Sequence, residues 1–301
     1  MATEKEVNAM NYSPLRYPGG KSRLAPFISL LIQKSKIENP VYVEPFAGGA
    51  GVALSLLLNS IVDEIVINDY DKAIYSVWRA LLTETNRFIE LIEDTPLNIE
   101  EWRVQKRIYD EEGSRYSLKL GFAAFYLNRT NRSGILSNAG PIGGFDQMGN
   151  YLIDARFNRQ ELVRRVCEIA KYKSKIHLYN KDIRMFLKKY MPKYQERAFI
   201  YFDPPYYNKG KALYKNFFSP LDHQEIFKHI CPWLVTYDDV PEIREIYSSY
   251  VGKRYDLTYS LANNGKKSEL MFLSDDSLWP NEAELKERQI SINLRGEDNG
   301  E

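Results

Sequence analysis

The order of apolar runs along this chain constrains its fold more than any other feature. Six runs of strand length alternate with longer segments whose apolar residues recur at helical spacing. The runs are Val41–Glu44, Glu64–Asn68, Ile176–Tyr179, Ala198–Phe202, Trp233–Thr236 and Glu269–Leu273. The helical patterns are Ala50–Leu58, Lys72–Glu93, Ile183–Tyr190, His223–Ile230 and Pro241–Tyr247. Strands that alternate with helices predict an α/β fold with a mainly parallel sheet covered on both faces.

This alternation lapses between Thr95 and Lys175. Helical patterns and one turn-rich stretch take its place, at Ile99–Asp110, Ser117–Leu127, residues 129–150 and Asn158–Lys173. Glycine, asparagine and serine are frequent in the turn-rich stretch, and these residues favour the backbone angles of tight turns. We therefore expect a mainly helical inserted domain at residues 95–174, with a hairpin loop at 129–150.

The rest of the chain is expected to form one discontinuous α/β domain from residues 1–94 and 175–280, followed by a polar tail at 281–301. The composition, 44% hydrophobic and 27% charged residues, is typical of a globular protein. No apolar segment approaches the length of a bilayer span, so we expect a cytoplasmic protein without a membrane partner. Cys167 and Cys231 lie far apart and the three histidines are scattered, so neither a disulfide framework nor a metal site is expected.

The tetrapeptide Asp203-Pro204-Pro205-Tyr206 directly follows the apolar run Ala198–Phe202. A buried strand that ends in an acid places the carboxylate at the carboxyl edge of the sheet, where open α/β sheets bind ligands. The two prolines have no N–H, which leaves the carbonyl groups before them free to accept hydrogen bonds from a ligand. Tyr206 adds an aromatic face, so the site suits an exocyclic amino group on a planar base. An ordinary strand-to-loop turn is the alternative.

A second ligand-binding turn is predicted after the first strand. Glu44 is followed by Phe46, Gly48 and Gly49, and a helical pattern then begins. Glycines let a ligand lie against the backbone, and a helix N-terminus offers unpaired N–H groups. The spacing does not match the GxGxxG dinucleotide fingerprint. Asp69 follows the next strand, where Rossmann-like sheets place a carboxylate on ribose hydroxyls, and a helix N-cap is its alternative role.

The sequence Gly20-Lys21-Ser22 looks like the end of a Walker A loop. However, Leu15 occupies the position of the first glycine of that loop, and no strand precedes it. We therefore exclude nucleoside triphosphate binding. A tight turn that delivers Lys21 to an anionic group remains open.

The net charge of +1 hides an uneven distribution. From residue 101 to 190 basic residues outnumber acidic ones by about two to one, whereas the segment after Ser274 is acidic. A basic face suits a polyanion such as a nucleic acid, and a solvated helical surface is the alternative.

Four of these motifs, in this order, resemble the Dam-type (D12 class) adenine-N6 DNA methyltransferases. They are Tyr17-Pro18-Gly19-Gly20-Lys21, Glu44-Pro45-Phe46-Ala47-Gly48-Gly49, Asn68-Asp69 and Asp203-Pro204-Pro205-Tyr206. Each motif alone is weak, but four motifs in a fixed order are specific. The order of cofactor turn, insertion and Asp-Pro-Pro-Tyr is the one called group α. The resemblance extends from about Pro14 to Ser274.

The resemblance implies a Rossmann-like, S-adenosylmethionine-dependent methyltransferase sheet with an insertion that recognises the target. By similarity, the cofactor S-adenosylmethionine lies across the carboxyl ends of the first strands. The residues that the resemblance places around it are Tyr17, Lys21, Glu44, Phe46, Gly48, Gly49, Asp69, Asp182 and Asp203. The residues that it places at the methyl-accepting base are Asp203, Pro204, Pro205 and Tyr206.

The implied activity is site-specific methylation of adenine N6 in double-stranded DNA, with the target base flipped out of the helix. Residues 207–218 are then expected to form a mobile loop over the pocket. In the insertion, Arg129 is expected to contact phosphates. The residues expected to reach base edges are Asn131, Arg132, Ser133 and the residues up to Asn138.

The hairpin differs from that of the GATC-methylating members, which carry aromatic and arginine residues where this chain has Arg132, Ser133 and Ser137. No recognition sequence is therefore assigned, and a cognate restriction endonuclease remains open as a partner. Enzymes of the same fold that act on cytosine N4 or on RNA are one alternative. A DNA-binding homologue without catalytic activity is another, and the presence of Asp203 and Lys21 argues against it.

Overall fold

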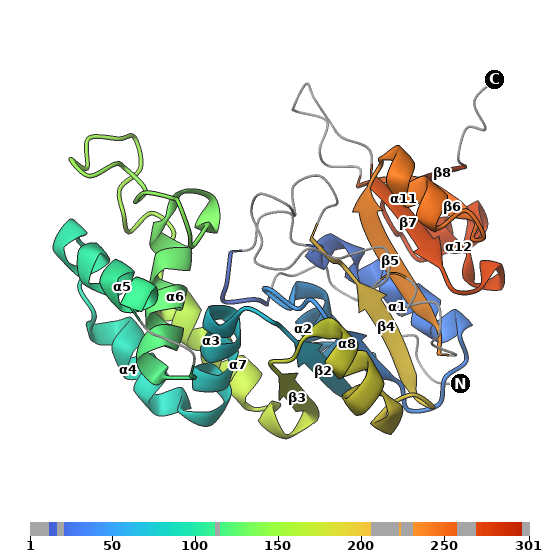
Figure 1. The fold of residues 1–301 in the computed structure, drawn as a ribbon, viewed down its shortest axis with the longest axis horizontal. Helices are drawn as coiled ribbons and strands as arrows, with labels where there is room; N and C mark the ends of the chain where they lie inside the picture. The colour runs from blue at the N-terminus through green and yellow to red at the C-terminus, as the bar shows by residue number, and fades with distance from the viewer. Residues whose placement is uncertain are drawn as a thin grey trace.

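The computed structural model describes residues 12–16, 21–111, 115–205, 223, 231–257 and 269–296. Within these residues an eight-stranded sheet has the order β3-β2-β1-β4-β5-β7-β6-β8 (Figure 1). The strands are β1 (Val41–Glu44), β2 (Glu64–Asn68), β3 (Ile176–Tyr179), β4 (Ala198–Phe202), β5 (Trp233–Asp238), β6 (Gly252–Leu257), β7 (Glu269–Leu273) and β8 (Ile292–Gly296). Strands β1 to β5 are parallel, and β7, β6 and β8 join them as antiparallel strands. The predicted α/β, Rossmann-like fold class is confirmed, because 3-2-1-4-5 is the doubly wound strand order.

The central strands are apolar because both faces of the sheet are covered. Every residue of β1 and of β4 is buried. Alternate residues point to opposite faces, so Tyr42 packs in one hydrophobic core whereas Val41 and Val43 pack in another. These two cores fix the register of the strands, since a shift by one residue would exchange their side chains.

Helices cover both faces of the sheet (Figure 1). The first core includes residues of α1 (Ala25–Lys34), α2 (Gly51–Leu58), α3 (Lys72–Thr83) and α4 (Thr85–Asp94). The second core is packed by α8 (Ile183–Met185), the π-helical turn Phe186–Tyr190 that continues it, and α11 (Pro241–Ile246). Helix α1 was not predicted. The single helix expected at 72–93 is two helices, because the chain bends at Glu84, which has φ −127° and ψ 38°.

The segment between β2 and β3 is mainly helical. It contains α5 (Ile99–Glu111), α6 (Leu118–Thr130) and α7 (Arg159–Ala170), which lie with α4 on one side of the molecule (Figure 1). Helix α6 packs closely on α3, since a Cβ atom added at Gly121 would lie 2.5 Å from the carbonyl oxygen of Ser76. Beyond α6, a bridge between Asn131 and Pro141 closes the base of the turn-rich loop.

The end of the chain differs from the polar tail expected at 281–301. Helix α12 (Glu282–Glu287) begins with a capping box between Asn281 and Glu284, and β8 pairs with β6. Leu285 and Ile292 are each 9% exposed. The charged sequence conceals these elements because an edge strand and a surface helix bury few side chains. The expected loop at 207–218 and most of the helix expected at 223–230 lie outside the described residues.

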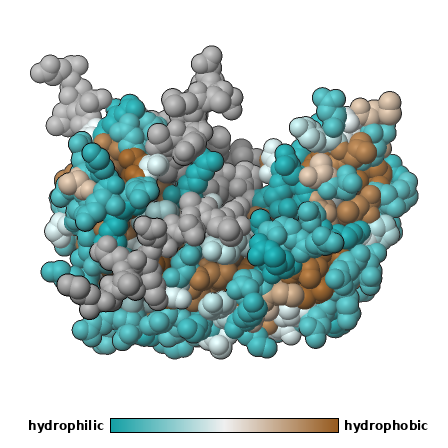
Figure 2. All heavy atoms as spheres, turned by 180° about the vertical axis from the view of Figure 1, so that it is seen from behind, coloured by the Kyte–Doolittle hydropathy of each residue, from teal (hydrophilic) through white to brown (hydrophobic). Residues whose placement is uncertain are grey.

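The face of the molecule opposite to that of Figure 1 is mostly hydrophilic, with smaller hydrophobic areas between the polar side chains (Figure 2). Large aromatic side chains such as Trp78 and Trp233 are among the fully buried residues. No helix among the described residues combines the length and the apolar character that a membrane span requires.

Candidate active site

The parallel strands bring their carboxyl ends to one edge of the sheet. β1 ends at Glu44, Asp69 follows β2, and Asp203 follows β4. The register places β1 between β2 and β4, so these three carboxylates belong to neighbouring strands. The sequence prediction that they meet at the ligand-binding edge agrees with this topology.

The glycine turn after β1 is held in place by hydrogen bonds. Gly48 has φ 46°, in the left-handed region that glycine adopts without strain. Its N–H donates to Asp69 Oδ2 (2.8 Å), and its carbonyl oxygen accepts from Trp78 Nε1 (2.9 Å). Asp69 Oδ1 also accepts from the N–H of Asp71 (2.9 Å). Asp71, and not Asp69, is the N-cap of α3, because its side chain accepts from the N–H of Ala73.

Asn68 joins three segments at this edge. Its amide nitrogen donates to the carbonyl oxygens of Pro45 and Lys181, both at 3.0 Å, and its amide oxygen accepts from the N–H of Lys181 (2.9 Å). It is 1% exposed. The glycine turn and the segment after β3 are therefore fixed to the end of β2 by one buried side chain.

Asp203 is half-buried and reaches the surface at the carboxyl end of β4. Its Oδ1 accepts a hydrogen bond from Thr236 Oγ1 (3.0 Å), and the same hydroxyl lies 2.9 Å from Tyr201 Oη. Burial raises the pKa of Asp203, and the charge of Lys21 lowers it in part. Thr236 thus orients the Asp203 carboxylate, and the charge of Lys21 acts on it.

Lys21 lies at this edge although it precedes β1 by twenty positions along the chain. Its ammonium group is 2.5 Å from Glu269 Oε2, and the residue is 8% exposed. The same carboxylate oxygen accepts a hydrogen bond from the hydroxyl of Tyr255. Lys21 is therefore fixed by the antiparallel pair β6 and β7, at a distance where its charge acts on Asp203.

Glu44 is the most deeply buried acid of the edge, at 4% exposure. Burial raises its pKa to about 8, and the charge of Asp203 contributes to the rise. Tyr42 Oη donates to Glu44 Oε1 (3.2 Å), whereas Oε2 is buried without a hydrogen-bond partner among the described residues. A buried, unpartnered carboxylate oxygen is costly unless the group is protonated or a ligand binds it.

Among the residues expected to contact DNA, Asn131 lies where it cannot do so. It is fully buried, its Oδ1 accepts from Trp102 Nε1 (2.7 Å), and its Nδ2 donates to the carbonyl oxygen of Ile135 (2.7 Å). The expectation that Asn131 reaches base edges is therefore wrong, because its amide group supports the turn from inside. Arg132 and Ser133, by contrast, are exposed.

The turn itself has unusual backbone angles. Ser133 and Asn138 have φ values of 55° and 58°, which residues other than glycine seldom adopt. Asn138 is also exposed, whereas Arg129 is half-buried in the last turn of α6. Burial lowers the pKa of Arg129 to about 10, and the charges of neighbouring arginines add to this effect.

A sequence model described as D12 class N6 adenine-specific DNA methyltransferase matches residues 17–261. The chain belongs to this family. The match includes all the strands from β1 to β5 and the whole insertion between β2 and β3. The family assignment makes the chain an adenine DNA methyltransferase, as the sequence motifs indicated.

Two curated relatives are similar over about two thirds of their length. One is the Type II methyltransferase M1.LlaDCHI of Lactococcus lactis subsp. cremoris, which is 24% identical over 220 residues, or 67% of this chain and 68% of the relative. The other is the Type II methyltransferase M.MjaIII of Methanocaldococcus jannaschii, which is 23% identical over 205 residues, or 64% of this chain and 68% of the relative.

Solved structures similar to this chain include an rRNA methyltransferase from Streptomyces viridochromogenes. Its TM-score is 0.41 at 12% identity, with 87% of this chain and 88% of the other covered. A putative RNA methyltransferase from Pyrococcus horikoshii has a TM-score of 0.39 at 11% identity, with 86% and 84% covered.

The remaining predicted residues of this DNA methyltransferase occupy different settings. Gly49 is buried in the glycine turn, and Pro204 is buried beside Asp203. Phe46 and Pro205 are half-buried at the same edge. Asp182 is exposed, and its carboxylate caps α8 by accepting from the N–H of Arg184 (3.0 Å). Tyr17 and Tyr206 lie outside the described residues.

Three residues that support the site were not singled out from the sequence. Thr236 orients Asp203, Glu269 holds Lys21, and Trp78 fixes the glycine turn. The resemblance to the family includes Val235-Thr236-Tyr237-Asp238-Asp239 and the stretch from Tyr259 to Leu270, so these segments gave a signal for Thr236 and Glu269. The helical pattern at 72–93 gave none for Trp78, because an apolar side chain in a helix is expected in any core.

Proposed function

We propose that this protein transfers a methyl group from S-adenosylmethionine to N6 of adenine at specific sites in double-stranded DNA. The observation that carries the proposal is Asp203, a half-buried carboxylate at the carboxyl end of β4, oriented by Thr236 and close to Lys21. Residues 1–94 and 175–280 would form the catalytic domain, and residues 95–174 would recognise the target.

The residues at the sheet edge fit S-adenosylmethionine. The cofactor carries an ammonium and a sulfonium group, and an unpartnered oxygen of Glu44 together with Asp203 offers negative charge for them. Asp69 has a pKa raised to about 7, mainly by burial, and would accept hydrogen bonds from ribose hydroxyls. When bound, the cofactor would supply an electrophilic methyl group. The other residues proposed to line its site are Tyr17, Lys21, Phe46, Gly48, Gly49 and Asp182.

The residues after β4 would activate the adenine amine. The N6 lone pair is delocalised into the ring, so the nitrogen is a poor nucleophile. Hydrogen bonds from N6–H to the Asp203 carboxylate and to the Pro204 carbonyl would favour a tetrahedral nitrogen and localise that pair. Most of the rate enhancement would come from orientation toward the methyl group. The proton that the product nitrogen must lose would pass to Asp203 and then to water.

The target base would be flipped out of the duplex, because its amino group is inaccessible inside the helix. Tyr206 would stack on the flipped base, with Pro205 holding the turn. The exposed residues Arg132, Ser133 and Asn138 would contact base edges, and Arg129 would contact the phosphate backbone. Both curated relatives carry the name of type II methyltransferases, which supports a modification role alongside a cognate restriction endonuclease.

Transfer of a tritiated methyl group to unmethylated duplex DNA tests the proposal. Asp203→Asn keeps the shape of the side chain but removes its charge, and we expect the transfer rate to fall by about 100-fold or more. Asp63→Asn, which changes an exposed carboxylate before β2, is the matched control and should keep full activity. Wild-type activity in Asp203→Asn would refute the assigned role.

The modified nucleoside identifies the acceptor. Digestion of the labelled DNA and chromatography should give N6-methyl-2′-deoxyadenosine as the labelled nucleoside. Label on N4 of cytosine, or label only on RNA, would replace the proposal with one of the related activities. Sequencing of the modified DNA with methylation-sensitive detection would then give the recognition sequence.

A further inference from the structure

Three separate segments meet beside the turn after α6. Asn128 accepts a hydrogen bond from the N–H of Arg16 (2.7 Å) and donates to the carbonyl oxygens of Arg16 (2.7 Å) and Gly134 (2.9 Å). A Cβ atom added at Gly134 would lie 2.6 Å from the Arg16 oxygen, so the turn and the N-terminal segment are in close contact. Residues 13–16 are thereby fixed to the inserted helices.

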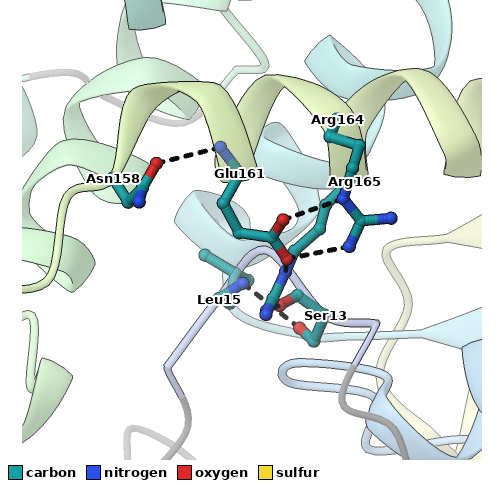
Figure 3. Close-up of polar contacts among 6 residues, drawn as sticks. All are labelled: Ser13, Leu15, Asn158, Glu161, Arg164 and Arg165. Atoms are coloured by element: carbon teal, nitrogen blue, oxygen red, sulfur yellow. Dashed lines mark hydrogen bonds and ion pairs between the residues drawn. The ribbon is translucent and has the colours of Figure 1, made fainter.

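Helix α7 holds the same N-terminal segment from another side (Figure 3). Arg165 donates from one terminal nitrogen to the carbonyl oxygen of Ser13 (2.7 Å) and from Nε to Glu161 (2.8 Å). Glu161 is shared, because Arg164 also donates to both of its oxygens at 2.8 Å. One carboxylate is thus engaged by two guanidinium groups.

Four arginines gather at this junction. Arg16 comes from the N-terminal segment, Arg129 from α6, Arg156 from the loop before α7, and Arg165 from α7. The pKa of Arg129 is lowered to about 10, first by burial and then by the charges of Arg16, Arg165 and Arg156. The pKa of Arg16 is also lowered, by burial and then by Arg156. The charges of Arg16, Arg156 and Arg165 thus act unfavourably on Arg129, and the charge of Arg156 acts unfavourably on Arg16.

Negative charge is scarce around the cluster. Among the described residues, Arg16, Arg129 and Arg156 form no ion pair within 4.0 Å, and Glu161 is already shared. The Nε of Arg129 is buried, and no described residue accepts a hydrogen bond from it. Half-buried guanidinium groups without counter-charges cost folding free energy, which a bound anion would recover.

We propose that Arg16, Arg129, Arg156 and Arg165 form a composite anion site that binds one backbone phosphodiester of the DNA. The proposal rests on the proposed function, and it extends the phosphate contact expected of Arg129 to a site built by the N-terminal segment, α6, α7 and the loop before α7. Guanidinium groups suit this ligand because their paired N–H donors match two phosphate oxygens. Arg156 is exposed, so this part of the site faces solvent, and the turn Arg132–Gly134 closely approaches Arg16.

Salt-dependent binding of a labelled duplex of mixed sequence, measured by fluorescence anisotropy, tests the site. Arg129→Gln and Arg156→Gln should each weaken binding by about tenfold at low salt and reduce the slope of log K against log salt by about one. Arg164→Gln is the matched control. It removes a charge from α7, the helix of Arg165, and breaks the ion pair of Arg164 with Glu161, but Arg164 is not part of the cluster. It should leave affinity and slope unchanged.

The stability of the DNA-free protein gives a second readout. Arg156 is exposed, so Arg156→Gln should fold, and relief of repulsion should leave its melting temperature equal to that of the wild type or higher. A simple loss of structure would lower both the melting temperature and the affinity. Unchanged affinity and slope in both cluster variants, or an equal loss in Arg164→Gln, would overturn the anion site. Failure of the wild type to methylate any duplex would overturn the proposed function instead.

Discussion

At the scale of single residues, Glu44 has an unusual environment for a carboxyl group. Strand β1 carries its carboxyl group into the interior, where one oxygen bonds to Tyr42 and the other has no partner among the described residues. Its pKa is raised to about 8, so the group is mostly protonated at neutral pH in the absence of a ligand. A cationic cofactor beside it would favour the ionised form.

The raised pKa of Glu44 predicts a pH-dependent stability. The folded protein keeps a proton that the unfolded chain releases above its ordinary pKa of about 4.3, so the free energy of unfolding falls as pH rises toward 8. The total fall from this group is up to about 5 kcal/mol. Glu44→Gln should remove that part of the slope and be more stable than the wild type at pH 8. Urea denaturation at several pH values measures this.

Glu38→Gln provides the control for that experiment, because Glu38 is exposed. Its stability should follow the wild-type pH curve. Parallel curves for the wild type and Glu44→Gln would show that the Glu44 carboxyl is ionised in the folded protein, contrary to the prediction.

Some residue roles follow from local sequence and others do not. Asp69 and Asp203 were placed correctly at the sheet edge because each directly follows a strand. Asn131 was misassigned because the sequence of a turn does not reveal that Trp102, 29 positions earlier, bonds to its side chain. The pairing of Lys21 with Glu269 spans 248 positions, and no local pattern predicts it.

At the scale of elements, the six predicted strands were found because buried parallel strands are continuous apolar runs. β6 and β8 were not predicted, since edge-side strands such as Gly252–Leu257 mix charged and apolar residues. The helical insertion was recognised from periodicity, but its packing on α3 was not. That packing depends on Gly121, whose missing side chain lets the two helix backbones approach.

Gly121→Ala should therefore destabilise the protein by about 2 kcal/mol. The added Cβ atom would lie 2.5 Å from the Ser76 oxygen and 3.3 Å from the Ala80 side chain, so the helices must move apart. Gly140→Ala is the matched control, because its nearest neighbour would be the Phe145 ring at 3.9 Å. Thermal denaturation of both variants measures the difference. Equal melting temperatures would contradict the close-packing argument.

At the scale of the whole molecule, an early and a late segment of the chain act together on Asp203. Lys21 precedes α1, whereas Glu269 begins β7, and together they set the charge beside the carboxylate. Lys21 lowers the pKa of Asp203 and Glu269 raises it. The pKa of the proposed catalytic carboxyl group thus depends on two segments that come together only in the folded protein.

Opposite shifts in the pH–rate profile should result from removal of these two charges. If Asp203 must be ionised, the rate falls as pH drops through its pKa. Glu269→Gln should move this acid limb to lower pH, and Lys21→Met should move it to higher pH. Single-turnover methyl transfer over a range of pH measures both shifts.

The ion pair between Lys34 and Glu284 supplies the control, since it also joins an early helix to a late one. Glu284→Gln should leave the acid limb where it is in the wild type. Shifts of Glu269→Gln and Lys21→Met in the same direction would show that the two residues do not act on Asp203 through their charges.

Strands β2 and β3 are direct neighbours, although the chain leaves the sheet at Asn68 and returns only at Ile176. The chain between these residues therefore starts and ends at adjacent strands. The Asn68 side chain joins the two points by its hydrogen bonds to the backbone of Lys181, just after β3. Asp69 and Trp78, which hold the glycine turn, lie at the start of this stretch, so it is in residues 95–174 that substitutions and length changes can accumulate while the strand ladder stays intact. With the proposed recognition role of residues 95–174, such a scaffold can acquire a new DNA preference in evolution without rebuilding its chemical centre.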